Sequence, residues 1–151
     1  MAVWVRLPLS LAAIRKWAEA QGFKNLVPAN KMHVTVAFSR TTLDWMRIDR
    51  SYEAEIRLIG GARLVELLGP KNAPVLMFKS ESLEARHRNI MLTGASWDFD
   101  GYYPHISLSY DSTDVNLDKI ENYQGEIVLG EEVFEEVVEN WATMFDARPS
   151  K

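Results

Sequence analysis

Two segments of the chain repeat the order histidine, apolar residue, hydroxyl residue, apolar residue. They are His-Val-Thr-Val at 33–36 and His-Ile-Ser-Leu at 105–108. Phosphodiester cleavage needs one group that takes a proton from the attacking oxygen and another that gives a proton to the leaving oxygen. Histidine suits both tasks because its unperturbed pKa is about 6.5. The pattern therefore predicts His33 and His105 as an acid–base pair, with Thr35 and Ser107 donating hydrogen bonds to the phosphate oxygens.

Each motif also has a plainer reading. A single strand histidine is usually structural, so it is the doubling of the motif, with matching apolar flanks, that favours chemistry. Two histidines could also bind zinc, but a catalytic zinc site usually takes a third protein ligand. The chain has no His-Glu-x-x-His segment, and Asp111 and Asp114 fit a turn better than a ligand set. We therefore expect neither a metal nor a cofactor.

Composition indicates an ordinary globular protein. A chain of 151 residues is the size of one domain, so we expect a single domain over 1–151. No apolar run approaches the roughly 20 residues of a membrane helix, and the N-terminus lacks the pattern of a signal peptide. There are no cysteines, which excludes disulfides and thiolate chemistry and fits a cytoplasmic protein.

The charge balance restricts the partners. A formal net charge of -4 argues against a protein that neutralises many phosphates along DNA or RNA. It does not argue against one small nucleotide in a local pocket. Aromatic residues make up 11% of the chain, and one or two of them could stack on bases.

Hydrophobic periodicity predicts the elements that must position the motifs. Alternation indicates strands at 2–7, 32–39, 53–59, 62–68, 75–78, from His105 onward, at 125–129 and at 133–141, and helical spacing indicates helices at 10–21 and 80–93. Ser10 and Ser80 are the expected helix caps. Gly60-Gly61 predicts a hairpin between two strands, and 44–48 suits a short helical turn. His87, on the second helix, is expected to be a surface or partly buried residue.

The two halves share an order that ends in a histidine strand. This suggests a pseudo-symmetric α+β fold in which both histidine strands lie near each other in one concave sheet. Strict alternation would place His33 and Thr35 on one face, with Val34, Val36 and Phe38 behind them. It would likewise group His105, Ser107 and Ser109, backed by apolar residues at 106, 108 and 110.

These motifs resemble those of the two-histidine (2H) phosphoesterase superfamily, over nearly the whole chain. The resemblance includes Leu7-Pro8, the Lys31-Met32 and Tyr103-Pro104 leads into the two motifs, and the segment 130–136. The segments 25–28, 32–36 and 94–98 are similar to phage anti-CBASS proteins, which cleave the cyclic di- and trinucleotides that bacteria use as antiviral signals.

The resemblance implies a two-lobed fold with concave antiparallel sheets and helices packed outside. It implies a metal-independent phosphodiesterase that hydrolyses 3'-5' linkages of cyclic di- and trinucleotides, so that a phage evades CBASS defence in the host bacterial cytoplasm. The expected partner is that small substrate, with no long nucleic acid and no membrane. Two alternatives stay open: a non-catalytic cyclic-nucleotide sponge, and an RNA 2',3'-cyclic phosphodiesterase of the same superfamily.

The resemblance also assigns residues beyond the motifs. Ser107 stands where the family often has threonine, which keeps the hydroxyl donor. Trp4 on the first strand would contact a base. Apart from the resemblance, Tyr102 and Tyr103 precede the second motif in a loop, where they could line the pocket or merely pack on it. An acidic residue and a tryptophan are expected on the last strand, where Glu135 and Trp141 share a face; a register slip by one would select Glu136 instead. The plainer alternatives are a core role for Trp4 and a solvated acidic cluster around Glu135.

Overall fold

The structure is a computed structural model, and it describes residues 2–41, 56–69, 72–110 and 116–135. The strands are β1 (Ala2–Val5), β2 (Val34–Phe38), β3 (Ile56–Leu58), β4 (Arg63–Leu68), β5 (Ala73–Phe78), β6 (His105–Ser107), β7 (Ile127–Leu129) and β8 (Glu132–Glu135). The helices are α1 (Leu11–Ala20) and α2 (Glu81–Met91), with short 3-10 turns at Ala29–Lys31 and Leu117–Lys119. The predicted α+β class is confirmed.

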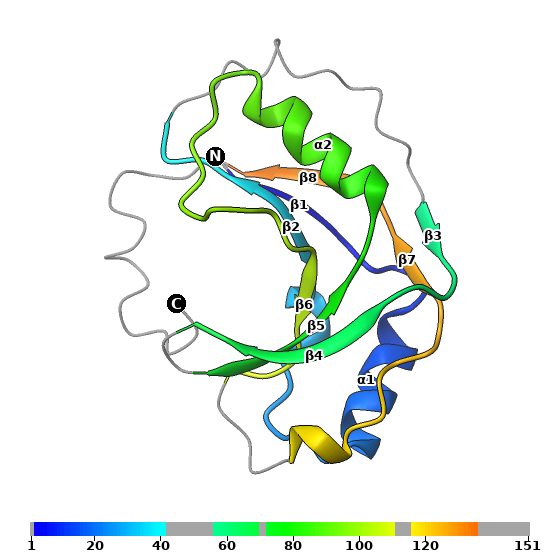
Figure 1. The fold of residues 1–151 in the computed structure, drawn as a ribbon. Helices are drawn as coiled ribbons and strands as arrows, with labels where there is room; N and C mark the ends of the chain where they lie inside the picture. Colours follow the sequence, from blue (N-terminus) through cyan, green and yellow to red (C-terminus); the bar gives the residue numbers. More distant parts are fainter. Residues whose placement is uncertain (1, 42–55, 70–71, 111–115, 136–151) are drawn as a thin grey trace.

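The strands form antiparallel sheets in the orders β2-β1-β8, β3-β7 and β4-β5-β6. Figure 1 shows α2 lying over the first sheet and α1 at the opposite end of the molecule. β2 and β6 contact each other between the two lobes. The histidine motifs therefore do not lie in one concave sheet, as their similarity suggested; they lie on adjoining edge strands of two different sheets.

Both helices bury one face against the sheets. Ile14 and Ala18 on α1 are four residues apart and fully buried, and Leu83 and Ile90 on α2, seven residues apart, are fully buried as well. The Ser80 hydroxyl caps α2 by accepting a 3.2 Å hydrogen bond from the Leu83 amide. Ser10 precedes α1 but makes no such cap. Its hydroxyl instead accepts from the Val128 amide at 3.0 Å, which joins the start of α1 to β7.

The hairpin predicted around Gly60-Gly61 is wrong. β3 pairs with β7, and β4 pairs with β5, so the two glycines carry the chain from one sheet to another. Both have positive φ, +72° and +89°, which glycine adopts without strain. The buried Arg63 guanidinium stabilises this crossing by donating to the carbonyls of Leu58 and Gly60 at 3.2 and 3.1 Å, and to that of Gly125 at 3.0 Å.

The alternation predicted along β2 fails at one residue. Val3 pairs with Ala37 and Trp4 pairs with Thr35, so the register skips Val36. This is a bulge-type shift, in which one strand carries an extra residue. It places the consecutive residues Val36 and Ala37 in the core and leaves Phe38 only half-buried, contrary to the expectation that Phe38 packs behind the motif.

The second motif departs from alternation as well. β6 ends at Ser107, and Ser109 is 2% exposed rather than sharing the open face with His105 and Ser107. The Ser109 hydroxyl donates to the Lys24 carbonyl at 2.8 Å, which draws its side chain inward. The predicted turn at 44–48, most of the final strand and Trp141 lie outside the described residues. No helix among the described ranges is long and apolar enough to cross a membrane.

Candidate active site

His33 immediately precedes β2 and is half-buried. Its Nδ1 lies 2.7 Å from the carbonyl oxygen of Lys31, two residues earlier. A carbonyl oxygen can only accept a hydrogen bond, so Nδ1 must carry the proton. In the neutral ring the lone pair is then on Nε2, and Nε2 is the atom that can take a proton from a nucleophile.

His105 repeats this arrangement in the other sheet. It is the first residue of β6, is half-buried, and places Nδ1 2.8 Å from the carbonyl oxygen of Tyr103, again two residues earlier. The same tautomer follows, with Nε2 as the proton-transferring atom. Both rings are therefore fixed by their own preceding backbone, and neither is sealed in the apolar core.

Direct contacts bring the two motifs together. β2 and β6 are neighbours, and the Tyr102 hydroxyl donates to the Thr35 carbonyl at 2.7 Å. The Leu108 carbonyl accepts from the Val27 amide at 2.9 Å, which ties the last residue of the second motif to the loop before the first. Segments far apart in the sequence thus form one site region between the lobes (Figure 1).

Trp4 and Thr35 share a face of the β2-β1-β8 sheet, because they are direct partners across an antiparallel pair. The Trp4 ring lies 5.2 Å from the His33 ring, centroid to centroid, at an angle of 58°. The Arg6 guanidinium lies 4.8 Å from the centroid of the Trp4 ring. Trp4 is half-buried, so the structure gives it a position beside His33 rather than in the core.

Ser107 and His105 lie on the corresponding face of the second sheet. His105 is opposite Met77 on β5, and Ser107 is opposite Val75. Leu64 on β4 continues the same row beyond Met77 and is 50% exposed. Ser107 is itself exposed, so its hydroxyl faces away from the core and can reach a ligand.

The other residues predicted to bind substrate differ in how much the structure says of their position. Glu135 is exposed and pairs with Ala2, and alternation puts Ala2 on the face that carries Trp4. Tyr103 is 60% exposed, and its carbonyl accepts the His105 hydrogen bond. Trp141 and the alternative acidic residue, Glu136, lie outside the described residues.

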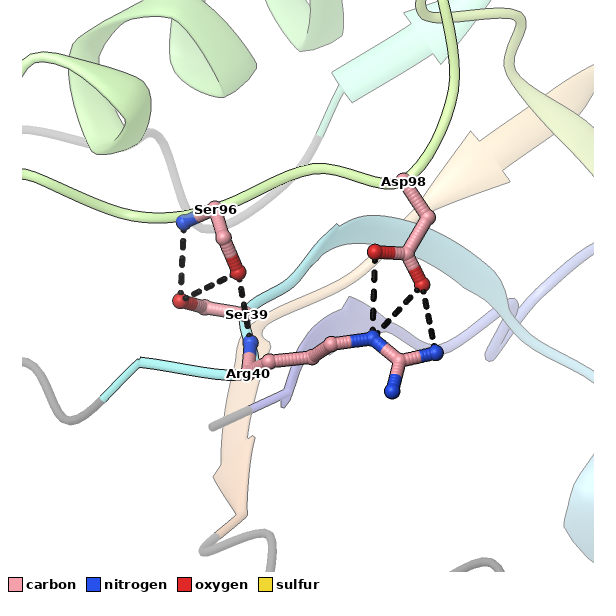
Figure 2. Close-up of polar contacts among 4 residues, drawn as sticks. All are labelled: Ser39, Arg40, Ser96 and Asp98. Carbon is pink, nitrogen blue, oxygen red and sulfur yellow. Dashed lines mark hydrogen bonds and ion pairs between the residues drawn. The ribbon is translucent and has the colours of Figure 1, made fainter.

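Hydrogen bonds and an ion pair join the loop between α2 and β6 to the residues that follow β2. Figure 2 shows these two groups of contacts. The Ser39 hydroxyl accepts from the Ser96 amide at 3.0 Å, and the Ser96 hydroxyl accepts from the Arg40 amide at 2.7 Å. Further along, the Arg40 guanidinium pairs with the Asp98 carboxylate, with Nε–oxygen distances of 3.1 and 2.9 Å.

His87 is 7% exposed, so it is buried more completely than the surface or partly buried position expected for it. Its Nδ1 donates to the Val36 carbonyl at 2.7 Å, and its ring stacks on Tyr102 at 4.4 Å with only 8° between the planes. Burial lowers the pKa of His87, the bond to Val36 opposes this, and the Arg88 charge adds to the lowering. Sequence patterns showed a helical histidine but no partner for it.

The rings of this aromatic stack help to line a hollow of about 360 Å³. It contains neither motif histidine, so we do not place the chemistry there. Its lining residues are Glu84, His87, Arg88, Met91, Trp97, Asp100, Gly101 and Tyr102. Within the described part of the chain, no three His, Cys, Asp or Glu side chains cluster closely enough to hold a metal ion.

Arg6 was missed at the level of sequence. Alternation along β1 puts it on the same face as Trp4, so a signal for it existed. Its guanidinium over the Trp4 ring is a cation–π contact, and such a contact holds both side chains at the edge of the site. Tyr102 was noticed only as a residue that could line or pack on the pocket.

Comparison with known proteins identifies the family of the chain. The family model described as "Anti-CBASS protein Acb1" matches residues 2–144. A relative of that name from Sphingomonas paeninsulae is 46% identical over 147 residues, which cover 92% of this chain and 23% of the relative. One from Acinetobacter phage Ac42 is 31% identical over 119 residues, covering 78% of this chain and 76% of the phage protein.

Solved structures share the fold. A phosphoesterase and Escherichia coli LigT in its apo form superpose with TM-scores of 0.60 and 0.59. Each is 16% identical and covers 87% of this chain and 83% of its own. The predicted two-histidine phosphoesterase-like fold is therefore confirmed. The chain spans about a quarter of the length of the Sphingomonas relative.

Proposed function

The chain belongs to the Anti-CBASS protein Acb1 family, and we propose that it is a metal-independent phosphodiesterase acting on cyclic di- and trinucleotide signals. Its role would be to remove the signal on which CBASS defence depends, so that a phage escapes it. The observation that carries the proposal is the matched geometry of His33 and His105. Each has Nδ1 bound to the carbonyl two residues earlier, and their strands adjoin.

The reaction needs two proton transfers at one phosphate. One neutral histidine takes the proton of the nucleophile at Nε2, while the other, protonated, gives its Nε2 proton to the leaving 5'-oxygen. The bond from phosphorus to the nucleophile forms and the bond to the 5'-oxygen breaks. With the ribose 2'-hydroxyl as nucleophile, a 2',3'-cyclic phosphate results. Water then opens it with the histidine roles exchanged.

Six further residues serve binding and charge stabilisation in this scheme. Thr35 and Ser107 hydroxyls donate to the non-bridging oxygens, where charge grows in the transition state. Trp4 stacks on a base and so helps to align the phosphate. Glu135 accepts hydrogen bonds from a base, and Tyr103 borders the site. Trp141 is assigned to substrate binding from the family resemblance alone.

A product assay tests the proposal. The protein is incubated in EDTA with a panel of cyclic di- and trinucleotides, and the products are separated by chromatography. We expect linear products from at least one member of the panel. Activity lost in EDTA and restored by zinc would overturn the metal-independent scheme.

The same assay separates the two alternatives. Ligand that binds but is recovered unchanged after long incubation identifies a sponge. An RNA with a 2',3'-cyclic end, included in the panel, identifies an RNA-end enzyme if it is opened faster than every cyclic oligonucleotide. The pair of well-oriented histidines favours catalysis over sequestration, because binding alone needs no acid–base pair.

A further inference from the structure

We propose that His87 and Tyr102 are positioning residues that fix the bulge in β2 and thereby hold the first histidine motif in register with the second. The inference rests on the proposed function for its kinetic test. Neither residue is assigned a part in proton transfer. Both act through the backbone of β2, on which Thr35 lies.

The bulge is where the first motif receives its geometry. Because the pairing with β1 skips Val36, the backbone at 35–37 does not follow the regular ladder. Bulges re-aim the side chains beside them, and they are common next to active sites. Here the residue that precedes the skipped position is Thr35, the hydroxyl predicted to hold the phosphate.

Two side chains from the second half of the chain bind this irregular backbone. The Tyr102 hydroxyl donates to the Thr35 carbonyl, and His87 Nδ1 donates to the Val36 carbonyl, both at 2.7 Å. The two carbonyls are consecutive, so both peptide units at the bulge are fixed from outside the sheet. A buried carbonyl without a hydrogen-bond partner is destabilising, so these donors also stabilise the bulge.

The two donors hold each other in place. Their rings are nearly parallel, and Trp97 packs edge-on against His87 at 4.6 Å between centroids. The Trp97 indole nitrogen donates to the Gly101 carbonyl at 3.0 Å, which closes the loop that carries Tyr102. The stacked pair is therefore a rigid unit rather than two independent contacts.

The same unit leads directly into the second motif. Tyr102 is followed by Tyr103, whose carbonyl accepts the hydrogen bond from His105 Nδ1. Tyr102 thus binds the backbone of the first motif, and its neighbour Tyr103 orients the histidine ring of the second. Displacing Tyr102 should consequently alter the separation of the two histidines, on which a concerted proton transfer depends.

The test compares two Tyr→Phe variants, each of which loses one hydrogen bond from a tyrosine hydroxyl to a backbone carbonyl. Tyr102→Phe removes the hydroxyl that donates to Thr35 and keeps the ring. Tyr123→Phe removes a hydroxyl that donates to the Glu126 carbonyl at 3.0 Å, away from both motifs. We expect Tyr102→Phe to lower kcat about fivefold to tenfold with little change in KM, and Tyr123→Phe to leave kcat within a factor of two.

His87 provides a second pair of variants. His87→Asn keeps an N–H donor near the position of Nδ1, whereas His87→Leu removes it. We expect kcat to fall in the order wild type, His87→Asn, His87→Leu. Equal kcat values for the two variants would show that the donor to Val36 does not matter.

A measurement independent of activity completes the test. Backbone amide chemical shifts should change at 34–37 and at 103–107 in Tyr102→Phe and remain at wild-type values there in Tyr123→Phe. Unchanged shifts at both segments in Tyr102→Phe would overturn the inference, whatever the protein hydrolyses. A wild-type protein inactive on the whole panel would refute the proposed function alone, while an active one with unaltered kcat in Tyr102→Phe would refute the positioning role alone.

Discussion

The Arg86 guanidinium makes two hydrogen bonds to the Glu132 carboxylate, at 2.7 Å from Nε and 2.8 Å from Nη2, with both side chains buried. Arg86 is on α2, and Glu132 begins β8. The pair therefore fixes the helix to the strand that ends in Glu135. Bidentate pairs of this kind are geometrically specific as well as strong.

Breaking this pair on one side should destabilise the fold. Arg86→Ala leaves an uncompensated buried carboxylate, and we expect the free energy of unfolding to fall by about 3–5 kcal/mol. Urea denaturation followed by tryptophan fluorescence measures the change. Arg88→Ala, an exposed arginine on the same helix, is the matched control and should cost less than about 0.5 kcal/mol. Similar losses in the two variants would contradict the structural role of the pair.

Removing either motif histidine should abolish most turnover. His33→Ala and His105→Ala should each lower kcat roughly 10²- to 10⁴-fold, the range for a lost general acid or base. The kcat of the double variant should be only slightly lower than that of the less active single variant, because the two rings act in one step. Chromatographic rates at saturating substrate measure this. Near-wild-type rates in both single variants would remove these histidines from the chemistry.

Trp4 should affect binding more than chemistry. A base that stacks on an aromatic side chain gains about 1–3 kcal/mol, so Trp4→Ala should raise KM roughly 5- to 150-fold, and Trp4→Phe far less. Steady-state kinetics separate KM from kcat. Trp17→Phe, on α1 and bonded to the Glu121 carbonyl, is the remote control. If the KM of Trp4→Ala equals the wild-type value, Trp4 does not contact the substrate and only packs against its neighbours.

Thr35 should matter through its hydroxyl. Thr35→Val keeps the shape of the side chain and removes the donor, and we expect kcat to fall about 10²- to 10³-fold, as for the loss of one oxyanion donor. Thr35→Ser should retain much of the rate, since Ser107 already fills the equivalent position in the second motif. The contrary result would be a Thr35→Val variant as active as Thr35→Ser.

His87 should make the protein less stable in acid. In the folded state, burial lowers its pKa. The hydrogen bond to Val36 raises the pKa and so opposes burial, whereas the Arg88 charge lowers it further. Above pH 6.5 the ring is neutral in both states. As the pH falls below 6.5, the unfolded chain binds a proton that the folded chain does not. The free energy of unfolding then drops by about 1.4 kcal/mol per pH unit, until the lowered pKa is passed.

This linkage is measured by urea denaturation between pH 5 and pH 7.5. His87→Asn should flatten the acid limb, because asparagine does not titrate. The charged groups around the nearby hollow are Glu84, Arg88 and Asp100, and they remain in the variant. The same slope in the variant and the wild type would assign the acid sensitivity to those groups instead.

The sequence was sufficient to predict the α+β class, both motif strands and both helices, because those depend on local periodicity. The pairing of the strands could not be predicted in the same way. The glycines at 60 and 61 predict a turn correctly, but the choice of β7 over β4 as the partner of β3 is made by long-range packing. Periodicity of two also carries no information about a skipped residue, so the bulge at Val36 was invisible.

The same limit applies to the site. The motif residues were predicted from the sequence because each motif has its histidine and its hydroxyl within three positions. The contacts of His87 were not, because they join it to a carbonyl 51 residues away and to a ring from a separate loop. Trp141 keeps its predicted role untested, since it lies outside the described residues.

The acceptors that orient His33 and His105 are main-chain atoms, and this has a consequence for how such a site can vary. Lys31 and Tyr103 have nothing in common as side chains, yet they serve the two imidazoles identically, since every amino acid supplies the same oxygen. Substitution at either position leaves the tautomer of its histidine intact. Mutational drift can therefore change the side chains at positions 31 and 103 without changing which ring nitrogen of His33 or His105 carries the proton.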